Sequence, residues 1–254
     1  MKISTRQNKL INIVRRQEKA SVGELATLLN ASRETIRRDL TQLSNSGRIL
    51  KVHGGATIPR ALGEGCFKQR MSENVEGKMT IAQIAAALVK PGETLFIDTG
   101  STTLFFAEEL AKTPDLTVIT NSTEIARTIA SARNSSRVFL LGGEFRTDNG
   151  QTVGTMAATQ IKSFRAHHAF LTVGALDDRS GAMDFNIEEA QIARAMIDQS
   201  EAVTVLADSS KFGKLASFEV CSLQEINYLV TDLAPSPAIC EEIESVGGQV
   251  ILPV

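Results

Sequence analysis

The stretch Ser32-Arg33-Glu34-Thr35-Ile36-Arg37-Arg38-Asp39-Leu40 predicts a short helix with one buried face and one cationic face. Ser32 is a good N-cap residue, because its hydroxyl can accept a hydrogen bond from an early backbone N–H. Ile36, Leu40 and Leu43 recur at helical spacing, which predicts a core stripe. Arginine on the other face can bind phosphate or guanine through two parallel N–H bonds. We expect DNA contacts from Ser32, Arg33, Thr35, Arg37 and Arg38.

The residues before this helix predict two more helices. Leu10, Ile13 and Val14 form an amphipathic stripe, and Ser21-Val22-Gly23-Glu24 has the pattern of a capping box. The helix that this box opens is expected to bury Val22, Leu25 and Leu28. Only Leu29-Asn30-Ala31 separates it from the Ser32 cap. Two helices joined by a tight turn, the second carrying arginine, predict a helix-turn-helix whose second helix enters the major groove.

A short alternating segment bounded by glycines, Gly47 to Gly55, follows the arginine-rich helix and predicts a hairpin. Such a hairpin can act as a wing that places Arg48, Lys51 and His53 along the sugar-phosphate backbone. The alternative is a solvated, charged helix face that binds nothing. The capping, turn, core stripe and wing all favour DNA binding instead.

Charge is divided unequally along the chain. Residues 1–60 contain 12 Lys or Arg and 4 acidic residues, a net +8, whereas the other residues contain 15 and 25, a net −10. A basic head on an acidic body is typical of a nucleic-acid-binding module fused to another domain. We therefore predict a DNA-binding domain at 1–58, a linker at 59–77 and a second domain at 78–254, with double-stranded operator DNA as partner.

Composition narrows the class of protein. The chain has 254 residues, 43% of them hydrophobic, enough for two cores. It shows no signal-peptide pattern and no apolar run long enough to span a bilayer, which predicts a cytoplasmic protein without a membrane partner. The three cysteines, Cys66, Cys221 and Cys240, are scattered and predict free thiols. Their spacing gives no reason to expect a metal, and no cofactor is expected.

From about Lys78 onward, apolar strands alternate with helices, which predicts an α/β domain with a mostly parallel sheet covered on both faces. Strands are expected at 94–97, 116–119, 137–141, 169–173, 202–207, 228–230 and 249–252. Helices are expected at 81–89, stopped by Pro91-Gly92, and at about 186–200.

Polar residues that end these strands are candidates for a ligand site, because open α/β sheets bind ligands at the carboxyl ends of their strands. Asp98, Thr99, Gly100, Ser101, Thr102 and Thr103 end one strand and open a helix, whose free N–H groups favour an anion. Alternatively, the hydroxyls only cap that helix. Asp208-Ser209-Ser210-Lys211 could be a second anion-binding element or an ordinary turn. Glu189 could be a ligand contact or a solvated acid, and the adjacent His167 and His168 favour a structural role.

Together these motifs resemble the DeoR family of bacterial transcriptional regulators over nearly the whole chain, in particular the branch that includes the glycerol-3-phosphate repressor. The motifs that carry the resemblance are 24–26, Ser32, 35–40, 53–56, 96–103, Thr120-Asn121, Gly142-Gly143 and 208–213. The resemblance implies a winged helix-turn-helix followed by a sensor domain similar to ribose-5-phosphate isomerase. It also implies an effector site at Asp98 to Thr103, Asn121, Glu189 and Lys211. His167 and Ala193 depart from the family pattern at positions expected near the pocket.

The resemblance implies a repressor of a carbohydrate or polyol catabolic operon, controlled by a phosphorylated sugar or polyol, and not an enzyme. A homodimer or homotetramer is expected, since one head offers too few base contacts. One alternative is an active sugar-phosphate isomerase with an appended DNA-binding domain, in which Glu189, Asp98 and Lys211 supply the base, its partner and positive charge. A general architectural DNA-binding protein is a third class, which the acidic body disfavours.

Overall fold

The computed structural model describes residues 5–17, 19–45, 49–52, 54–57, 65 and 67–253. The chain divides into two compact units, Met1–Leu62 and Gly63–Val254, hereafter the N-terminal and C-terminal units. Of the expected linker 59–77, residues 59–64 and 66 lie outside the described residues. The same expected linker includes helix α4 (Phe67–Arg70) and the beginning of α5 (Val75–Ala86). Within the described residues, no helix is long and apolar enough to cross a membrane.

Three helices form the N-terminal unit: α1 (Thr5–Gln17), α2 (Val22–Leu28) and α3 (Arg33–Asn45). The predicted capping box opens α2: the Ser21 hydroxyl accepts from the Glu24 N–H, and the Glu24 carboxylate accepts from the Ser21 N–H. Ile36, Leu40 and Leu43 are buried, as the α3 stripe predicted. The prediction for Leu28 was wrong, because its side chain is 58% exposed at the end of α2, where the chain turns away.

A three-stranded antiparallel sheet completes this unit, in the order β1-β3-β2. The predicted hairpin is formed by β2 (Leu50–Val52) and β3 (Gly55–Thr57), joined through Gly54 at φ +77°. Strand β1 (Lys19–Ser21), which pairs with β3, was not predicted. Arg48 and His53, the other two expected wing contacts, lie outside the described residues.

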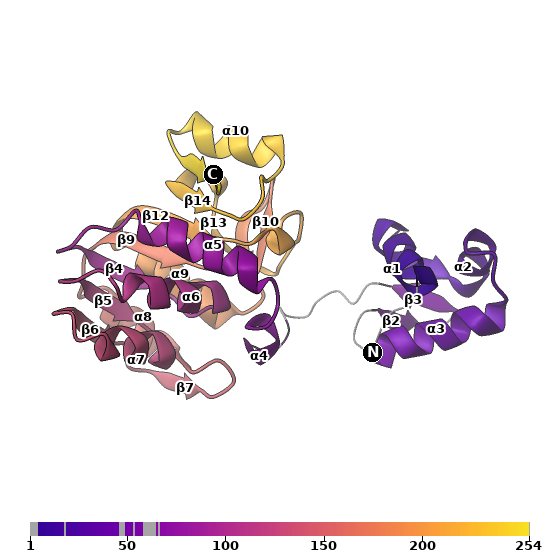
Figure 1. Ribbon diagram of the computed structural model, residues 1–254, viewed down its shortest axis with the longest axis horizontal. Coiled ribbons are helices and arrows are strands. Elements are labelled where there is room, and N and C mark those ends of the chain that lie inside the picture. The colour runs from indigo at the N-terminus through magenta and orange to yellow at the C-terminus, as the bar shows by residue number, and fades with distance from the viewer. Residues whose placement is uncertain are drawn as a thin grey trace. The chain divides into compact units, whose positions relative to one another are not determined.

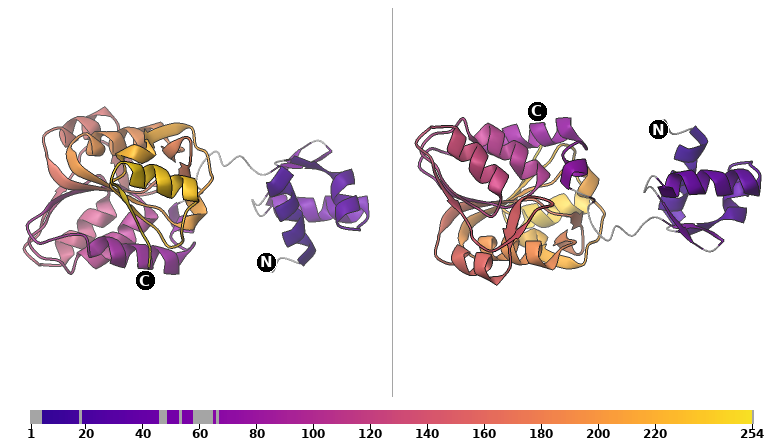
Figure 2. Two further views of the ribbon diagram at one scale, coloured as in Figure 1. Left: turned by 90° about the horizontal axis from the view of Figure 1, so that it is seen from above. Right: turned by 90° about the horizontal axis from the view of Figure 1, so that it is seen from below.

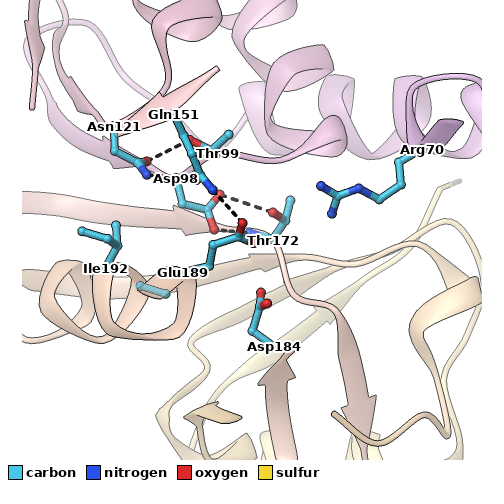
Figure 3. Close-up of a pocket in the computed structure, with 10 residues that line it drawn as sticks. Arg70, Asp98, Thr99, Asn121, Gln151, Thr172, Asp184, Glu189 and Ile192 are labelled. Atoms are coloured by element: carbon cyan, nitrogen blue, oxygen red, sulfur yellow. Dashed lines mark hydrogen bonds between the residues drawn. The ribbon is translucent and has the colours of Figure 1, made fainter. Parts of the chain in front are cut away.

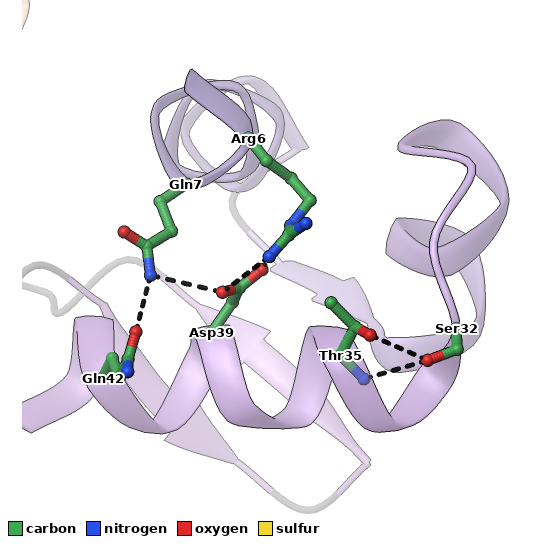
Figure 4. A network of polar contacts seen from close by, with 6 residues as sticks. All are labelled: Arg6, Gln7, Ser32, Thr35, Asp39 and Gln42. Atoms are coloured by element: carbon green, nitrogen blue, oxygen red, sulfur yellow. Dashed lines mark hydrogen bonds and ion pairs between the residues drawn. The ribbon is translucent and has the colours of Figure 1, made fainter. Parts of the chain in front are cut away.

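A buried carboxylate fastens α1 to α3 (Figure 4). Asp39, only 4% exposed, accepts hydrogen bonds from Arg6 Nε at 2.7 Å and Arg6 Nη2 at 3.2 Å. The Gln7 amide donates to the same carboxylate at 3.2 Å and to Gln42 at 2.8 Å. A buried acid is stable only with such partners. Asp39 therefore orients the arginine-bearing helix from behind.

Replacing Asp39 with Ala should lower the free energy of unfolding of the N-terminal unit by about 1–3 kcal/mol, because Arg6 and Gln7 lose their acceptor. Urea denaturation of the full chain, followed by circular dichroism, measures the change. Glu34→Ala, an exposed acid on the same helix, should change it by less than about 0.5 kcal/mol. Equal effects of the two substitutions would contradict the role given to Asp39.

The C-terminal unit is built on a parallel seven-stranded sheet in the order β15-β14-β12-β9-β4-β5-β6 (Figure 1). Each of these strands lies within two or three residues of a predicted one. They are β4 (Thr94–Ile97), β5 (Thr117–Thr120), β6 (Arg137–Leu140), β9 (Ala166–Leu171), β12 (Ser200–Leu206), β14 (Tyr228–Val230) and β15 (Gln249–Ile251).

Helices cover both faces of this sheet (Figure 2). Leu95 and Ile97 of β4 face a core with α5, α6 (Ser101–Leu110) and α7 (Thr123–Ser131), whereas Phe96 faces the opposite core. That second core includes α8 (Thr155–Ile161), α9 (Ile187–Ile197) and α10 (Pro237–Ser245). Because successive strand residues point to opposite faces, a sheet buried on both sides requires the continuous apolar runs seen in the sequence.

Two small antiparallel sheets were not predicted. One is the hairpin of β7 (Glu144–Arg146) and β8 (Gln151–Val153). The other consists of β10 (Ala175–Asp177), β11 (Gly181–Asp184) and β13 (Phe218–Cys221). Two single turns of 3-10 helix, η1 (Ser209–Lys211) and η2 (Leu223–Glu225), lie in the later connections. These additions carry polar residues to the carboxyl edge of the large sheet.

Candidate functional site

The N-terminal unit exposes the cationic side of α3. Arg33, Arg37 and Arg38 are exposed, and Arg37 lies 3.7 Å from Glu34. The Ser32 hydroxyl accepts from the Thr35 N–H at 3.1 Å, so it caps the helix as the sequence suggested. Lys51 of β2 donates to Thr41 of α3 at 3.2 Å, which places this wing residue beside the helix. The exposed arginines of α3 and Lys51 of β2 therefore form a positively charged surface on two elements that are joined by a hydrogen bond.

In the C-terminal unit, a pocket lies at the carboxyl ends of β4, β5 and β9. Figure 3 shows its lining side chains, which come from seven elements or their ends. The residues that line it are Arg70, Asp98, Thr99, Asn121, Gln151, Thr172, Asp184, Glu189, Ile192 and Ala193. This is the edge of the sheet at which a ligand was expected.

The turn from β4 into α6 lies against the end of β9. Asp98 accepts a hydrogen bond from the Thr172 backbone N–H at 2.9 Å. Gly100 approaches Thr172 so closely that a Cβ at position 100 would lie 2.1 Å from the Thr172 hydroxyl oxygen. Any residue with a side chain at position 100 would therefore force Thr172 to move. Thr103 donates within the turn, to the carbonyls of Asp98 and Gly100 at 3.0 and 3.2 Å, and thereby steadies the first turn of α6.

Amide side chains connect the opposite wall of the pocket. The Thr99 hydroxyl donates to the Asn121 side-chain carbonyl at 3.0 Å, and Asn121 donates to Gln151 at 3.3 Å. Gln151 and Asn149 donate to the same carboxylate oxygen of Glu189, at 2.6 and 3.1 Å. Glu189 is therefore held by two amides and is neither a solvated acid nor a freely rotating one.

Three carboxylates, those of Asp98, Asp184 and Glu189, line one small pocket. Burial raises the pKa of Asp98 well above its usual value, and the neighbouring charges of Asp184 and Glu189 add to this effect. Burial, followed by repulsion from Glu189, raises the pKa of Asp184 to about 6. Nevertheless, the described residues contain no group of three or more His, Cys, Asp or Glu placed to hold a metal ion.

Arg70 of α4 lines the pocket, and two further cations lie near Arg70, Lys78 on α5 and Lys211 on η1. Arg70 faces the pocket from the side opposite to Asn121 and Ile192 (Figure 3). Lys78 and Lys211 lie close by with Asp208, and burial is the main cause that lowers the pKa of both lysines. The charge of Asp208 opposes that shift in each case. We call Arg70, Lys78 and Lys211 the basic cluster.

The structure brings some of the expected site residues together and leaves others apart. Asp98, Thr99, Asn121 and Glu189 line the pocket, whereas Gly100, Ser101, Thr102, Thr103 and Lys211 lie outside its lining. Ala193 is in the lining. His167 is not near it: it lies at the beginning of β9, where its ring accepts from the Thr94 N–H at 3.0 Å. The expectation that His167 lies near the pocket was wrong, because β9 runs from His167 toward the pocket and reaches it only at Thr172.

Family models match both units: the DeoR-like helix-turn-helix domain matches residues 6–61, and the DeoR C terminal sensor domain matches residues 73–233. The chain belongs to the DeoR family. A similar relative is the HTH-type transcriptional repressor CsqR of Escherichia coli (strain K12), with 30% identity covering 98% of this chain and 95% of that one. Another, with 32% identity covering 95% of each, is the Glycerol-3-phosphate regulon repressor of the same organism.

Among solved structures, ribose 5-phosphate isomerase A from Methanocaldococcus jannaschii matches with 19% identity and a TM-score of 0.40, covering 55% of each chain. A likeness of this degree gives no basis for assigning the chemistry of an isomerase to this DeoR-family chain.

Several pocket residues were missed by the sequence reasoning. Thr172 was placed inside a predicted strand, although it is the residue that follows β9. Gln151 and Asp184 belong to the small antiparallel strands, which were not predicted. Arg70 was assigned to the linker. In the sequence, only the run Phe67-Lys68-Gln69-Arg70 indicated a helix there, and four residues are too few to identify a helix by periodicity.

The raised pKa of Asp184 predicts a pH-dependent penalty on stability. Because the folded pKa of about 6 exceeds the ordinary value of 3.8, the native state binds the proton more tightly, and stability falls as pH rises from 4 to 7. Asp184→Asn should therefore stabilise the C-terminal unit by about 1–3 kcal/mol at pH 8, with little effect at pH 4. Urea denaturation at both pH values measures this difference. Asp178→Asn, at an exposed acid in the turn between β10 and β11, is the control and should change the free energy of unfolding by less than about 0.5 kcal/mol. If Asp184→Asn were equally neutral at pH 8, the penalty would not exist.

Proposed function

We propose that this DeoR-family protein is a transcriptional repressor of a carbohydrate or polyol catabolic operon, controlled by a phosphorylated sugar or polyol bound in the C-terminal unit. The observation that carries the proposal is the pocket at the carboxyl ends of β4, β5 and β9, in a chain whose other unit exposes an arginine-bearing helix. The named repressors that resemble both units support it. Binding can control repression only if the effector binds the DNA-bound and free conformations with different affinity.

In this proposal the two ends of the ligand meet different chemistry. Asp98, Thr99, Asn121 and Glu189 contact the hydroxyl groups, since carboxylates and amides accept and donate hydrogen bonds in fixed directions. The phosphate lies at the start of α6, whose backbone N–H groups and dipole favour an anion. Contacts there come from Gly100, Ser101, Thr102 and Thr103, with positive charge from Lys211.

The helix-turn-helix contacts DNA through Ser32, Arg33, Thr35, Arg37 and Arg38. The wing contacts the sugar-phosphate backbone of the DNA through Arg48, Lys51 and His53. We propose that a homodimer or homotetramer supplies two such readers, so that half-sites lie about one helical turn apart. We also propose that the protein is not an enzyme. If it were an isomerase, purified protein would convert aldose phosphates to ketose phosphates, and Glu189→Gln would abolish that turnover.

Arg37→Ala and Arg38→Ala should each weaken operator binding by about 1–3 kcal/mol if the arginine contacts a base through two hydrogen bonds. Gel-shift titration at fixed salt against an operator selected from random-sequence DNA measures the change. Lys112→Ala removes an exposed cation from the C-terminal unit and should leave binding unchanged. Wild-type affinity in both arginine variants would contradict the assignment of α3 as the reader.

A thermal-shift panel tests the effector class. At about 100 times its dissociation constant, a true effector should stabilise the C-terminal unit by about 2.7 kcal/mol. The panel contains hexose, pentose and glycerol phosphates, each paired with its unphosphorylated parent. We expect a shift with at least one phosphorylated compound and a smaller or absent shift with its parent. A response to the parents alone would contradict a phosphorylated effector.

A further inference from the structure

Strand β6 is one edge of the seven-stranded sheet, and on its outer side no other strand lies among the described residues. The N–H groups of Arg137 and Leu141 donate to carbonyls on the β5 side, at 2.7 and 2.8 Å. Because successive N–H groups along a strand point to opposite edges, those of Val138 and Leu140 point away from the sheet. The described residues provide no hydrogen-bond partner for these two outward groups.

The outward N–H groups on either side of this pair are already occupied. The Ser136 N–H donates to the side-chain carbonyl of Asn134 at 3.3 Å, and the Gly142 N–H donates to that of Gln160 at 3.0 Å. The open part of the edge is therefore only as long as the two outward residues between them. An unpaired strand edge of this kind is a template for another strand.

The opposite edge of the sheet, β15, is protected where β6 is not. Strand β15 has three residues, follows Gly247-Gly248 and ends two residues before Pro253. Short edge strands and proline are common means by which sheets avoid pairing with other chains. Strand β6 contains no proline, and the side chain of Leu140 is 47% exposed. The β6 edge is thus the one suited to accept a further strand.

Apolar surface continues beside this edge. A Cβ on Gly143 would lie 2.5 Å from the Val153 carbonyl, so the chain that follows β6 packs against the chain that leads into α8. Phe145 and Met156 belong to these two packed segments, and the side chains of both are exposed. Exposed apolar side chains next to an open strand edge indicate a protein partner.

The free groups of β6 are complementary to a second copy of themselves. In a two-fold symmetric dimer, a strand that pairs with its own copy is antiparallel to it. One register uses all the free groups: Val138 lies opposite Leu140 of the partner subunit, and Phe139 lies on the two-fold axis. The two opposed residues exchange both hydrogen bonds, at two symmetric places, which gives four hydrogen bonds. A shift by two residues in either direction would require the occupied N–H of Ser136 or Gly142.

The side chains fit the same register. Val138 and Leu140 face the same side of the sheet, so the exposed Leu140 packs on the half-buried Val138 of the partner subunit. Arg137 lies opposite Leu141 of the partner subunit, which places the two arginines at opposite ends of the paired segment. Like charges are therefore not opposed across the strands, an arrangement that would be destabilising.

We propose that β6 pairs with β6 of a second copy in this register, so that two seven-stranded sheets join into one across a two-fold axis. The inference rests on the homo-oligomer in the function proposed above, and it adds the surface and the register. A dimer of this kind carries two DNA-binding units, as an operator with two half-sites requires.

The first test removes the outward N–H of β6. Val138→Pro removes it without breaking a hydrogen bond to β5, and Val250→Pro, the matched control, removes the outward N–H of β15. Sedimentation of the full chain measures the dissociation constant of the dimer, and melting reports folding. Val138→Pro should raise this constant about 10- to 100-fold, because symmetry removes two hydrogen bonds per dimer, whereas Val250→Pro should not change it.

The second test reads the register and uses milder substitutions, so it also serves if Val138→Pro does not fold. Val138→Cys and Leu140→Cys chains are expressed separately and together, oxidised and run on a non-reducing gel. Opposed residues in the proposed register have Cα atoms about 5.5 Å apart, within the range of a disulfide, whereas two copies of the same residue are too distant. We expect a cross-linked dimer only from the co-expressed pair. Wild type, oxidised in the same way, controls for its own cysteines.

Each test can overturn the inference. A Val138→Pro dimer as stable as that of Val250→Pro would remove β6 as the interface, and a co-expressed pair without a cross-linked dimer would reject the register. If wild type is dimeric or tetrameric and these results are obtained, only this inference fails. If wild type sediments as a monomer both free and on operator DNA, the proposed oligomer fails, and this inference fails with it.

Discussion

The carboxylate of Asp98 joins the ends of two neighbouring strands, and the geometry of the pocket depends on that joint. Strands β4 and β9 are paired in the sheet, and Asp98 at the end of one accepts the Thr172 N–H at the end of the other. The following glycine allows the turn to lie directly on Thr172. An acid buried in this way is costly unless it is hydrogen-bonded. The same contact thus satisfies Asp98 and fixes the position at which α6 begins.

The pocket maintains electrostatic strain because it places Asp98, Asp184 and Glu189 together. The pKa values of Asp98 and Asp184 are raised, so ionising these two acids lowers the free energy of unfolding of the native state. A pocket lined with apolar residues would not have this cost. Sites built for binding commonly give up stability in this way. Hydroxyl groups that donate hydrogen bonds to these carboxylates would relieve part of that strain, because hydrogen bonds to the charged form of an acid favour it.

Much of the fold could be predicted from the sequence, because its regular elements have strong patterns. Strands buried on both faces, such as Thr94–Ile97, need continuous apolar runs, which are easy to recognise in a sequence. The start of α2 was predicted from its capping box. The site was predicted only where a strand end supplied it. Asp98 and Asn121 follow predicted strands, but Gln151 and Asp184 lie on three- and four-residue strands whose pairing is set by tertiary contacts. Leu28 was predicted to be buried because it has helical spacing, but spacing alone does not show that the last turn of α2 faces solvent.

A ligand can shift the equilibrium between two conformations only by as much as its affinities for them differ. Most of the pocket wall is poorly suited to provide that difference. The Asp98 carboxylate accepts a hydrogen bond from Thr172 at the end of β9. Glu189 belongs to α9, whose inner face is part of the core, and its carboxylate accepts hydrogen bonds from two side-chain amides. Moving either would disturb a close-packed interior. Helix α4 is different, because none of its residues is fully buried and its arginine lines the pocket. Its last carbonyl accepts hydrogen bonds from Lys78 Nζ and from the Glu73 N–H. Among the described elements that line the pocket, α4 is also the one nearest in sequence to the DNA-binding unit.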